Sequence, residues 1–295
     1  MTTLNTNNNV WISVLLCTYN DEKYIREAVA SILDQTYPYF EFIIVDDGST
    51  DCTNKILKEF FDPRIILIEK KNTGLTDSLN IGFSHCKYDW VARMDGDDIS
   101  YSDRFEKQVK LIRHDIAVIG GQCTYIDSEG KKIRKSKLEI THKEILNNSL
   151  NGYTAHIHPT VLINKKLYFK VGGYDKYIYA AEDLDLWLSI SHYGQLMNLK
   201  DELIYYRIHD QKISSTKRKE QFFNCQIALL KYKRKVYRCL TLNEYTEMGK
   251  VVEKSFIYKL GLFFNLKSVY KKGISRRLYN FIVLFFSKIM RYSIK

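Results

Sequence analysis

The chain has 295 residues, of which 45% are apolar and only 3 are proline, so it can bury a sizeable core and is not a disordered polypeptide. Its first nine residues lack the basic and apolar segments of a secretory signal, and its six scattered cysteines form no Cys-x-x-Cys pair. We therefore expect a reduced, cytosolic protein without structural zinc.

The positive charge is concentrated at one end of the chain. Residues 211–295 contain 20 Lys and Arg against 4 Glu and no Asp, a net charge of +16. The remaining residues contain 25 basic and 30 acidic side chains, a net charge of −5. This asymmetry indicates two functions on one chain.

Between residues 10 and 124, strand and helix patterns alternate. The expected strands are 10–16, 40–45, 65–69 and 90–94, and the expected helices are 21–33, 52–61 and 76–84. This alternation predicts an α/β fold, a Rossmann-like and mostly parallel sheet with helices on both faces.

The periodicity weakens after residue 125. A basic, loop-like stretch at 131–137 precedes an expected strand at 161–163, a helix at 183–191 and a strand at 203–208. From residue 218 onward the pattern is helical, basic and aromatic.

An acidic turn, Asp95-Gly96-Asp97-Asp98, follows the strand expected at 90–94. Carboxylates two residues apart on such a turn can bind a hard divalent cation while phosphates and water complete its coordination. A solvated acidic turn is the alternative explanation.

A second acidic segment, Asp46 to Asp51, follows another strand, and Thr18-Tyr19-Asn20 follows the first. Ligands of parallel α/β sheets bind beyond the carboxyl ends of strands, where a carboxylate can accept hydrogen bonds from a base or ribose. Tyr19 can stack on the base. Alternatively, Gly48 forms a tight turn, Ser49 or Thr50 caps the next helix, and Tyr19 is simply half-buried.

Glu182 and Asp183 stand at the start of the helix expected at 183–191, where the helix dipole favours anions. Taken alone, the pair is explained by capping of this helix.

The order of these motifs resembles that of the family 2 glycosyltransferases, which have the GT-A fold. The resemblance covers roughly residues 12–214. Besides the segments above it includes Asn72-x-Gly74, Asn80-x-Gly82, His158-Pro159-Thr160, Gly172-Gly173-Tyr174-Asp175 and Tyr206-Arg207-Ile208-His209. The segment 75–78 lacks an arginine that many members carry there.

The resemblance implies specific roles for residues of this chain. Nucleotide binding is implied for Thr18, Tyr19, Asn20, Asp46, Asp47, Asn72, Gly74 and Asp95. Binding of Mn²⁺ or Mg²⁺ is implied for Asp95, Asp97 and His209, and acceptor binding for His158, Gly173 and Trp187. Asp183 matches the general base, and Glu182 a neighbour that orients the base or acceptor.

The implied reaction is a single displacement with inversion at the anomeric carbon. A hexose (galactose, glucose or N-acetylglucosamine) would pass from a UDP-sugar to a glycan or an undecaprenyl-pyrophosphate-linked sugar, during assembly of surface polysaccharide such as O-antigen or capsule. A GDP- or dTDP-linked donor, or a catalytically silent nucleotide-binding scaffold, are the alternatives.

We expect a catalytic domain at 1–215, with a nucleotide-binding half at about 10–124 and an acceptor half at about 125–215, and a basic amphipathic helical extension at 216–295. The apolar stretch within 276–288 has about nine residues, well short of the ~20 that span a bilayer. A basic helix of this kind fits peripheral attachment to the cytoplasmic face of the inner membrane. Packing on the catalytic domain or on a second copy in a homo-oligomer is the alternative; no nucleic-acid-binding motif accompanies the charge.

Overall fold

The computed structural model describes residues 9–152, 155–209 and 218–255. The strands are β1 (Ile12–Thr18), β2 (Phe40–Asp46), β3 (Ile65–Glu69), β4 (Trp90–Asp95), β5 (Ile99–Ser100), β6 (Ile116–Ile126), β7 (Lys132–Lys135), β8 (Leu162–Asn164) and β9 (Gln195–Arg207). The α-helices are α1 (Ile25–Leu33), α2 (Thr53–Leu57), α3 (Leu75–His85), α4 (Arg104–Val109), α5 (His142–Leu150), α6 (Lys165–Lys170), α7 (Glu182–Ile190), α9 (Arg218–Lys233) and α10 (Leu242–Lys254), with a 3₁₀ turn at His158–Thr160.

The first four long strands form a parallel sheet in the order β3-β2-β1-β4. Every residue of β1 is buried, as expected for an apolar, β-branched strand covered on both faces. The register sets Thr18 opposite Asp46 and Cys17 opposite Asp95. The polar segments that follow β1, β2 and β4 therefore meet at one edge of the sheet.

Beyond β4 the sheet is mixed rather than parallel. β8 is antiparallel to both β4 and β6, β6 is parallel to β9, and β9 is antiparallel to the short β5. The basic stretch at 131–137, expected as a loop, contains strand β7, which pairs with the end of β6. All four β7 residues are exposed, so main-chain pairing rather than a hydrophobic pattern defines this strand.

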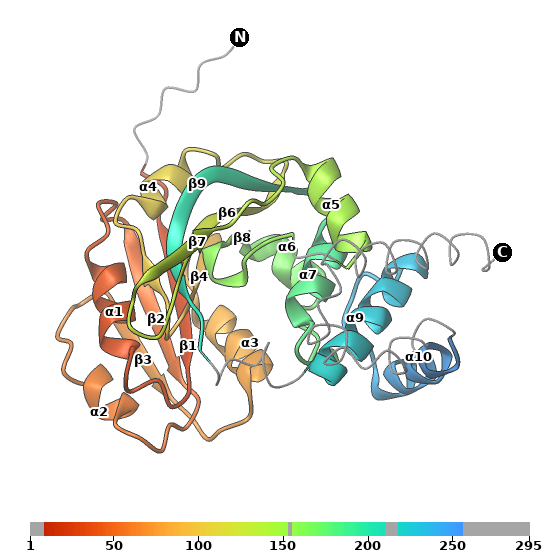
Figure 1. Cartoon of the computed structure of the whole chain (residues 1–295), viewed down its shortest axis with the longest axis horizontal. Helices are drawn as coiled ribbons and strands as arrows, with labels where there is room; N and C mark the ends of the chain where they lie inside the picture. Colours follow the sequence, from red (N-terminus) through yellow and green to blue (C-terminus); the bar gives the residue numbers. More distant parts are fainter. Residues whose placement is uncertain (1–8, 153–154, 210–217, 256–295) are drawn as a thin grey trace, which may run out of the picture.

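Helices cover both faces of the sheet (Figure 1). One core cluster packs α1, α2 and α4 on the sheet through residues such as Val29, Leu57 and Phe105. The other packs α3, α5, α6 and α7 on the opposite face, through Phe83, Trp187 and others. The α/β layering predicted from the sequence is confirmed.

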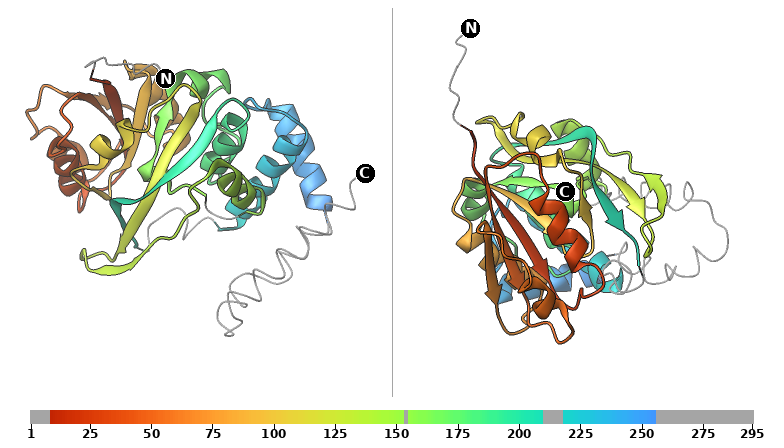
Figure 2. Two further views of the ribbon diagram at one scale, coloured as in Figure 1. Left: turned by 90° about the horizontal axis from the view of Figure 1, so that it is seen from above. Right: turned by 90° about the vertical axis from the view of Figure 1, so that its left-hand side faces the viewer.

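The helices α9 and α10 lie at the end of the molecule away from α1 and α2 (Figure 2). They share a third core cluster with α7, and the buried Lys231 of α9 lies 2.7 Å from Asp185 and 3.4 Å from Asp175. The boundary expected at residue 215 remains a prediction. The apolar stretch within 276–288 lies outside the described residues. No helix in the described part of the chain is long and apolar enough to cross a membrane.

Candidate active site

Three carboxylates gather where β4 ends. Asp95 is the last residue of the strand, and Asp97 and Asp98 follow after Gly96. One ligand oxygen from each of the three lies within 4.8 Å of the others. Asp97 and Asp98 are 8% and 1% exposed, so these charges are held together largely away from water. Oxygen ligands at this spacing fit a hard divalent cation, whose charge offsets their repulsion.

The end of β9 completes this cluster. His209 Nε2 lies 2.7 Å from Asp97 Oδ2, and an imidazole nitrogen is a second type of ligand compatible with Mn²⁺. The backbone N–H of Arg207 donates to Asp98 Oδ1 at 2.8 Å, and its Nε donates to the Asp97 carbonyl at 2.9 Å. Arg207 also lies over the Tyr24 ring, 4.4 Å from the centroid. Arg207 therefore holds the acidic turn against the end of β9 and the start of α1.

The carboxylates after β2 have protein partners. Asp46 Oδ1 accepts from the Ser49 amide at 3.0 Å, and its Oδ2 accepts from Asn54 Nδ2 at 2.9 Å. The Asp47 carboxylate forms an ion pair with Lys70 and accepts from the amides of Thr73 and Gly74, both at 2.9 Å. Asp47 thus shapes the loop that carries Asn72 and Gly74.

Capping of the next helix by Ser49 or Thr50, considered as a structural explanation, is wrong. The helix α2 begins only at Thr53, whose amide donates to Asp51 Oδ1 at 2.9 Å. Ser49 Oγ and the Thr50 amide instead bond Asn20, which has a positive φ of 57°. The segments after β1 and β2 are therefore locked to each other.

The segment after β1 adds a fourth carboxylate. Thr18 donates to Asp21 Oδ2 at 2.7 Å, and Tyr19 is 46% exposed, leaving its ring accessible. Burial, with repulsion from Asp97 and Asp95, raises the pKa of Asp21 to about 7. The Asp21 carboxyl belongs to the same acidic environment as the turn after β4.

Glu182 and Asp183 are the first two residues of α7, and the charge of Asp95 in the acidic turn acts on Glu182. Burial, with a contribution from Asp183, raises the pKa of Glu182 to about 7, and the charge of Asp95 acts in the same direction. Burial also raises the pKa of Asp183, against a 2.7 Å hydrogen bond that Asp183 Oδ1 accepts from the Leu184 amide. The charge of Asp95 therefore acts on Glu182, although the two residues lie far apart in the sequence.

This geometry agrees with the comparison with known proteins. Residues 13–172, more than half of the chain, match the family described as glycosyl transferase family 2. The chain belongs to this family. It is 31% identical over 256 residues to a putative glycosyltransferase, EpsE, of Bacillus subtilis, which covers 83% of this chain and 89% of that one. It is 33% identical over 222 residues to the O-antigen biosynthesis glycosyltransferase WbnJ of Escherichia coli, with 72% and 85% covered.

Solved structures agree with the fold of this family 2 glycosyltransferase. TarS of S. aureus, solved in complex with UDP-GlcNAc, superimposes with a TM-score of 0.64 at 20% identity, covering 91% of this chain and 77% of that one. The mannosyltransferase PcManGT of Pyrobaculum calidifontis, in complex with GDP-Man and Mn²⁺, superimposes with a TM-score of 0.57 at 14% identity, covering 96% and 87%. At these identities the likeness concerns the fold, which is that of the GT-A glycosyltransferases.

In this glycosyltransferase the three residues expected at the acceptor have structural partners. His158 Nε2 lies 2.7 Å from the Tyr174 hydroxyl, and the Trp187 ring, 2% exposed, packs edge-on against His158. Gly173 has a φ of 78°, and a Cβ there would lie 2.8 Å from Asn80 Oδ1. They lie packed together, and their contact with an acceptor remains a prediction.

Three residues near the acidic turn were not predicted from the sequence: Asp21, Arg207, and Arg93, whose Nη2 forms an ion pair with Asp95 Oδ1 at 2.5 Å. The signal for Arg93 was available: it is a charged residue inside the otherwise apolar run Trp90 to Met94. Asp21 had no comparable signal, because a carboxylate after a strand is ordinarily solvated.

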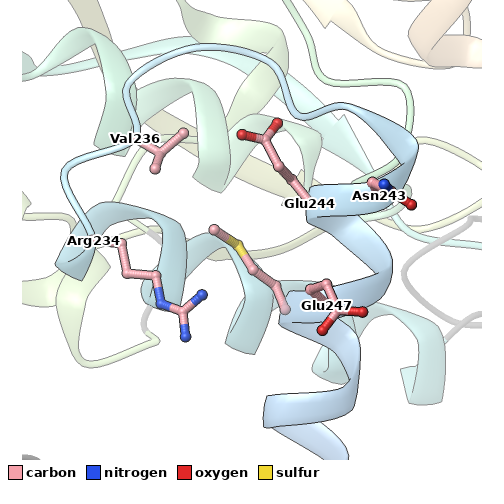
Figure 3. Close-up of a pocket in the computed structure, with 6 residues that line it drawn as sticks. Arg234, Val236, Asn243, Glu244 and Glu247 are labelled. Carbon is pink, nitrogen blue, oxygen red and sulfur yellow. The ribbon is translucent and has the colours of Figure 1, made fainter.

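A hollow elsewhere on the surface is separate from these residues (Figure 3). Arg234 and Val236, after α9, line it together with Asn243, Glu244, Glu247 and Met248 of α10. It contains none of the acidic residues described above, so it is not the candidate active site.

Proposed function

We propose that this glycosyltransferase is a metal-dependent, inverting hexosyltransferase that uses a UDP-sugar as donor. The observation that carries the proposal is the cluster of Asp95, Asp97 and Asp98, with His209 Nε2 2.7 Å from Asp97 Oδ2. The Glu182–Asp183 pair at the start of α7 is the second acidic site. A reaction that separates a diphosphate from a sugar needs positive charge at the first site and a base at the second.

Asp95, Asp97 and His209 would hold Mn²⁺ or Mg²⁺, with Asp98 fixed behind them by the Arg207 amide. The bound cation would supply positive charge to the departing diphosphate. Three carboxylates and an imidazole fit Mn²⁺ well, and carboxylates with water fit Mg²⁺.

Asp183 would act as the general base. It would take the proton from the acceptor hydroxyl while that oxygen attacks the anomeric carbon from the side opposite the diphosphate. Burial raises the pKa of Asp183, which makes its carboxylate a better proton acceptor than an exposed aspartate. Glu182 would orient the acceptor or the base. No covalent nucleophile is required, and the product has inverted stereochemistry.

Thr18, Tyr19, Asn20, Asp46, Asp47, Asn72, Gly74 and Asp95 would bind the nucleotide. The exposed Tyr19 ring is available for stacking on the base. The complex of TarS with UDP-GlcNAc supports a UDP-linked donor, and that of PcManGT with GDP-Man keeps a GDP-linked donor as the alternative. Galactose, glucose and N-acetylglucosamine are the hexoses we would screen first.

The acceptor would be a glycan or a sugar linked to undecaprenyl pyrophosphate, in surface polysaccharide assembly. The similarity to WbnJ, whose name states O-antigen biosynthesis, supports this assignment. The basic segment 216–295 would attach the enzyme peripherally to the cytoplasmic face of the inner membrane, close to a lipid-linked acceptor.

The test is thermal stabilisation of the purified protein by UDP, GDP and dTDP, each with and without Mn²⁺. A ligand that binds only the folded state raises the melting temperature by linkage. Stabilisation by UDP only in the presence of Mn²⁺ is the expected result. Stabilisation by GDP or dTDP instead would mean that the donor carries that nucleotide. Stabilisation by none of the three would favour the catalytically silent scaffold.

A further inference from the structure

Arg93 is a buried cation inside the parallel sheet. It lies on β4 two residues before Asp95, so strand alternation places both side chains on the same face. Its neighbours Ala92 and Met94 belong to the core on the opposite face. Arg93 is only 2% exposed. A guanidinium buried to this extent requires compensation for its lost hydration.

The compensation in the described structure is incomplete. Arg93 Nη2 forms an ion pair with Asp95 Oδ1 at 2.5 Å. Its Nε and Nη1 are buried and have no hydrogen-bond partner among residues 9–152, 155–209 and 218–255. Each unpaired, buried N–H group is costly. Two such groups on one side chain are donors that acceptor atoms of a ligand would satisfy.

Arg104 shows that this fold can satisfy a buried guanidinium fully. It is 0% exposed, yet its Nε donates to Gln108 Oε1 at 3.0 Å and its Nη2 to the Arg93 carbonyl at 2.8 Å. Its Nη1 lies 3.6 Å from Met94 Sδ. Of these two buried arginines only Arg93 retains unpaired donors, so Arg104 provides a matched control.

The Arg93 charge acts on groups of the candidate site besides Asp95. Burial raises the pKa of Glu182 and of Asp183, and the Arg93 guanidinium opposes both shifts. Burial lowers the pKa of His158, and the Arg93 charge lowers it further. Arg93 therefore lies within electrostatic range of the expected base while it directly contacts Asp95.

We propose that Arg93 binds the transferred hexose, with its Nε–H and Nη1–H donating to sugar hydroxyl oxygens. This inference rests on the function proposed above. The sugar must span the space between the diphosphate at Asp95 and Asp97 and the base Asp183; Arg93 contacts Asp95 directly, and its charge acts on Asp183. The positive charge of Arg93 is already balanced by Asp95. The unpaired Nε–H and Nη1–H groups therefore fit neutral hydroxyl oxygens better than the oxygens of a second anion.

The experiment compares Arg93→Lys with the wild type in the presence of Mn²⁺, with calorimetric affinities for UDP and for UDP-glucose, UDP-galactose and UDP-GlcNAc. If another nucleotide stabilises the wild type, its hexose conjugates replace these. Lysine preserves the charge beside Asp95 but removes the fork of donors. The expected result is a loss of about ten- to hundredfold in affinity for the preferred nucleotide hexose, with UDP affinity changed less than about threefold.

A second measurement needs no variant. Donor analogues that lack one hydroxyl, tested on the wild type, should include at least one that loses about tenfold or more in affinity. Arg93→Lys should be insensitive to that same deletion, because the interaction is already lost. Arg104→Lys should lower the melting temperature without changing the ratio of hexose-nucleotide to nucleotide affinity.

Three outcomes would overturn the inference. Unchanged affinities of Arg93→Lys for both UDP and the nucleotide hexose would mean that its donors do not contact the sugar. An equal loss for UDP would show that Arg93 acts only by positioning Asp95. If every deoxy analogue bound the wild type as tightly as the parent donor, no sugar hydroxyl would contribute to binding, and the proposed contact with Arg93 would be wrong. Failure of the wild type to bind any nucleotide or nucleotide sugar would instead overturn the proposed function itself.

Discussion

His209 Nε2 and Asp97 Oδ2 lie 2.7 Å apart although 112 residues separate them in the sequence. The long strand β9 carries His209 back to the acidic turn, where its ring lies 5.6 Å from that of Tyr24. A histidine after a strand is ordinarily structural. Its position against the expected metal ligand makes it a candidate ligand.

We expect His209→Ala to lower the affinity for Mn²⁺ by at least about tenfold, because one ligand or its orienting partner is lost. Manganese electron paramagnetic resonance, with UDP present, measures this directly. His85→Ala, at an exposed histidine on the end of α3, is the control. Equal Mn²⁺ affinity in the wild type and His209→Ala would show that His209 is not a metal ligand.

Asp183→Asn should reduce transfer by roughly 10²- to 10⁴-fold, because the amide cannot accept the acceptor proton. UDP affinity should change by less than about threefold, since the proposed function assigns Asp183 to the acceptor and not to the nucleotide. Initial rates with a radiolabelled donor and calorimetry with UDP and Mn²⁺ separate the two effects. Asp89→Asn, at an exposed carboxylate paired with Lys166, is the control. If Asp183→Asn transferred the sugar at the wild-type rate, Asp183 would not be the general base.

Arg207→Lys should destabilise the fold and weaken Mn²⁺ binding together. The lysine retains a charge but loses the fork that bonds the Asp97 carbonyl and reaches Glu27 Oε2 at 2.6 Å. We expect a loss of about 2–4 kcal/mol in the free energy of unfolding, measured by urea denaturation. Arg134→Lys, at an exposed arginine of β7, should cost less than about 0.5 kcal/mol. Comparable costs for both variants would contradict the positioning function of Arg207.

Glu182→Gln should stabilise the ligand-free protein at alkaline pH. Burial raises the pKa of Glu182 from its ordinary 4.5 to about 7, so between these values the folded state binds more protons than the unfolded state. The contribution of Glu182 to stability therefore falls as pH rises through this window. Above pH 7 the variant should be more stable by up to about 3 kcal/mol, and below pH 4.5 the difference should vanish. Urea denaturation at pH 5 and pH 8 checks this, and a constant difference would contradict it.

Lys231→Met should leave Asp175 and Asp185 buried without their shared cation. Burial raises the pKa of Asp185 to about 6, and Lys231 opposes that rise. Loss of the cation should cost about 3–5 kcal/mol in unfolding free energy at pH 8. Adding Asp185→Asn should recover part of this, because one unpaired charge is removed.

Lys250→Met, at a mostly exposed lysine of α10, is the control for Lys231→Met. A cost below about 1 kcal/mol for Lys231→Met would mean that α9 is not anchored to α7 by this triad. That result would favour an independent helical extension, as the predicted boundary at residue 215 implies.

The sequence predicted the strands and helices of the first half closely. β3 matches the expected range, and β2 and β4 extend it by one residue. The helix expected at 52–61 is only Thr53–Leu57. Of the next four residues, Lys58, Glu59 and Phe61 are exposed and only Phe60 packs against the core. The strand β7 was missed, since main-chain pairing with β6 leaves no periodic pattern in its exposed side chains.

The sequence by itself determined that Asp46 and Asp95 lie at the carboxyl ends of strands, because apolar runs and the polar breaks that follow them are local signals. Only the tertiary structure decided which distant groups join them: Arg207 of β9, His209 after it, and Asp21 after β1. Sheet register and helix packing set those contacts. They act between segments up to about a hundred residues or more apart, and no local pattern encodes which of many charged residues will be buried against another.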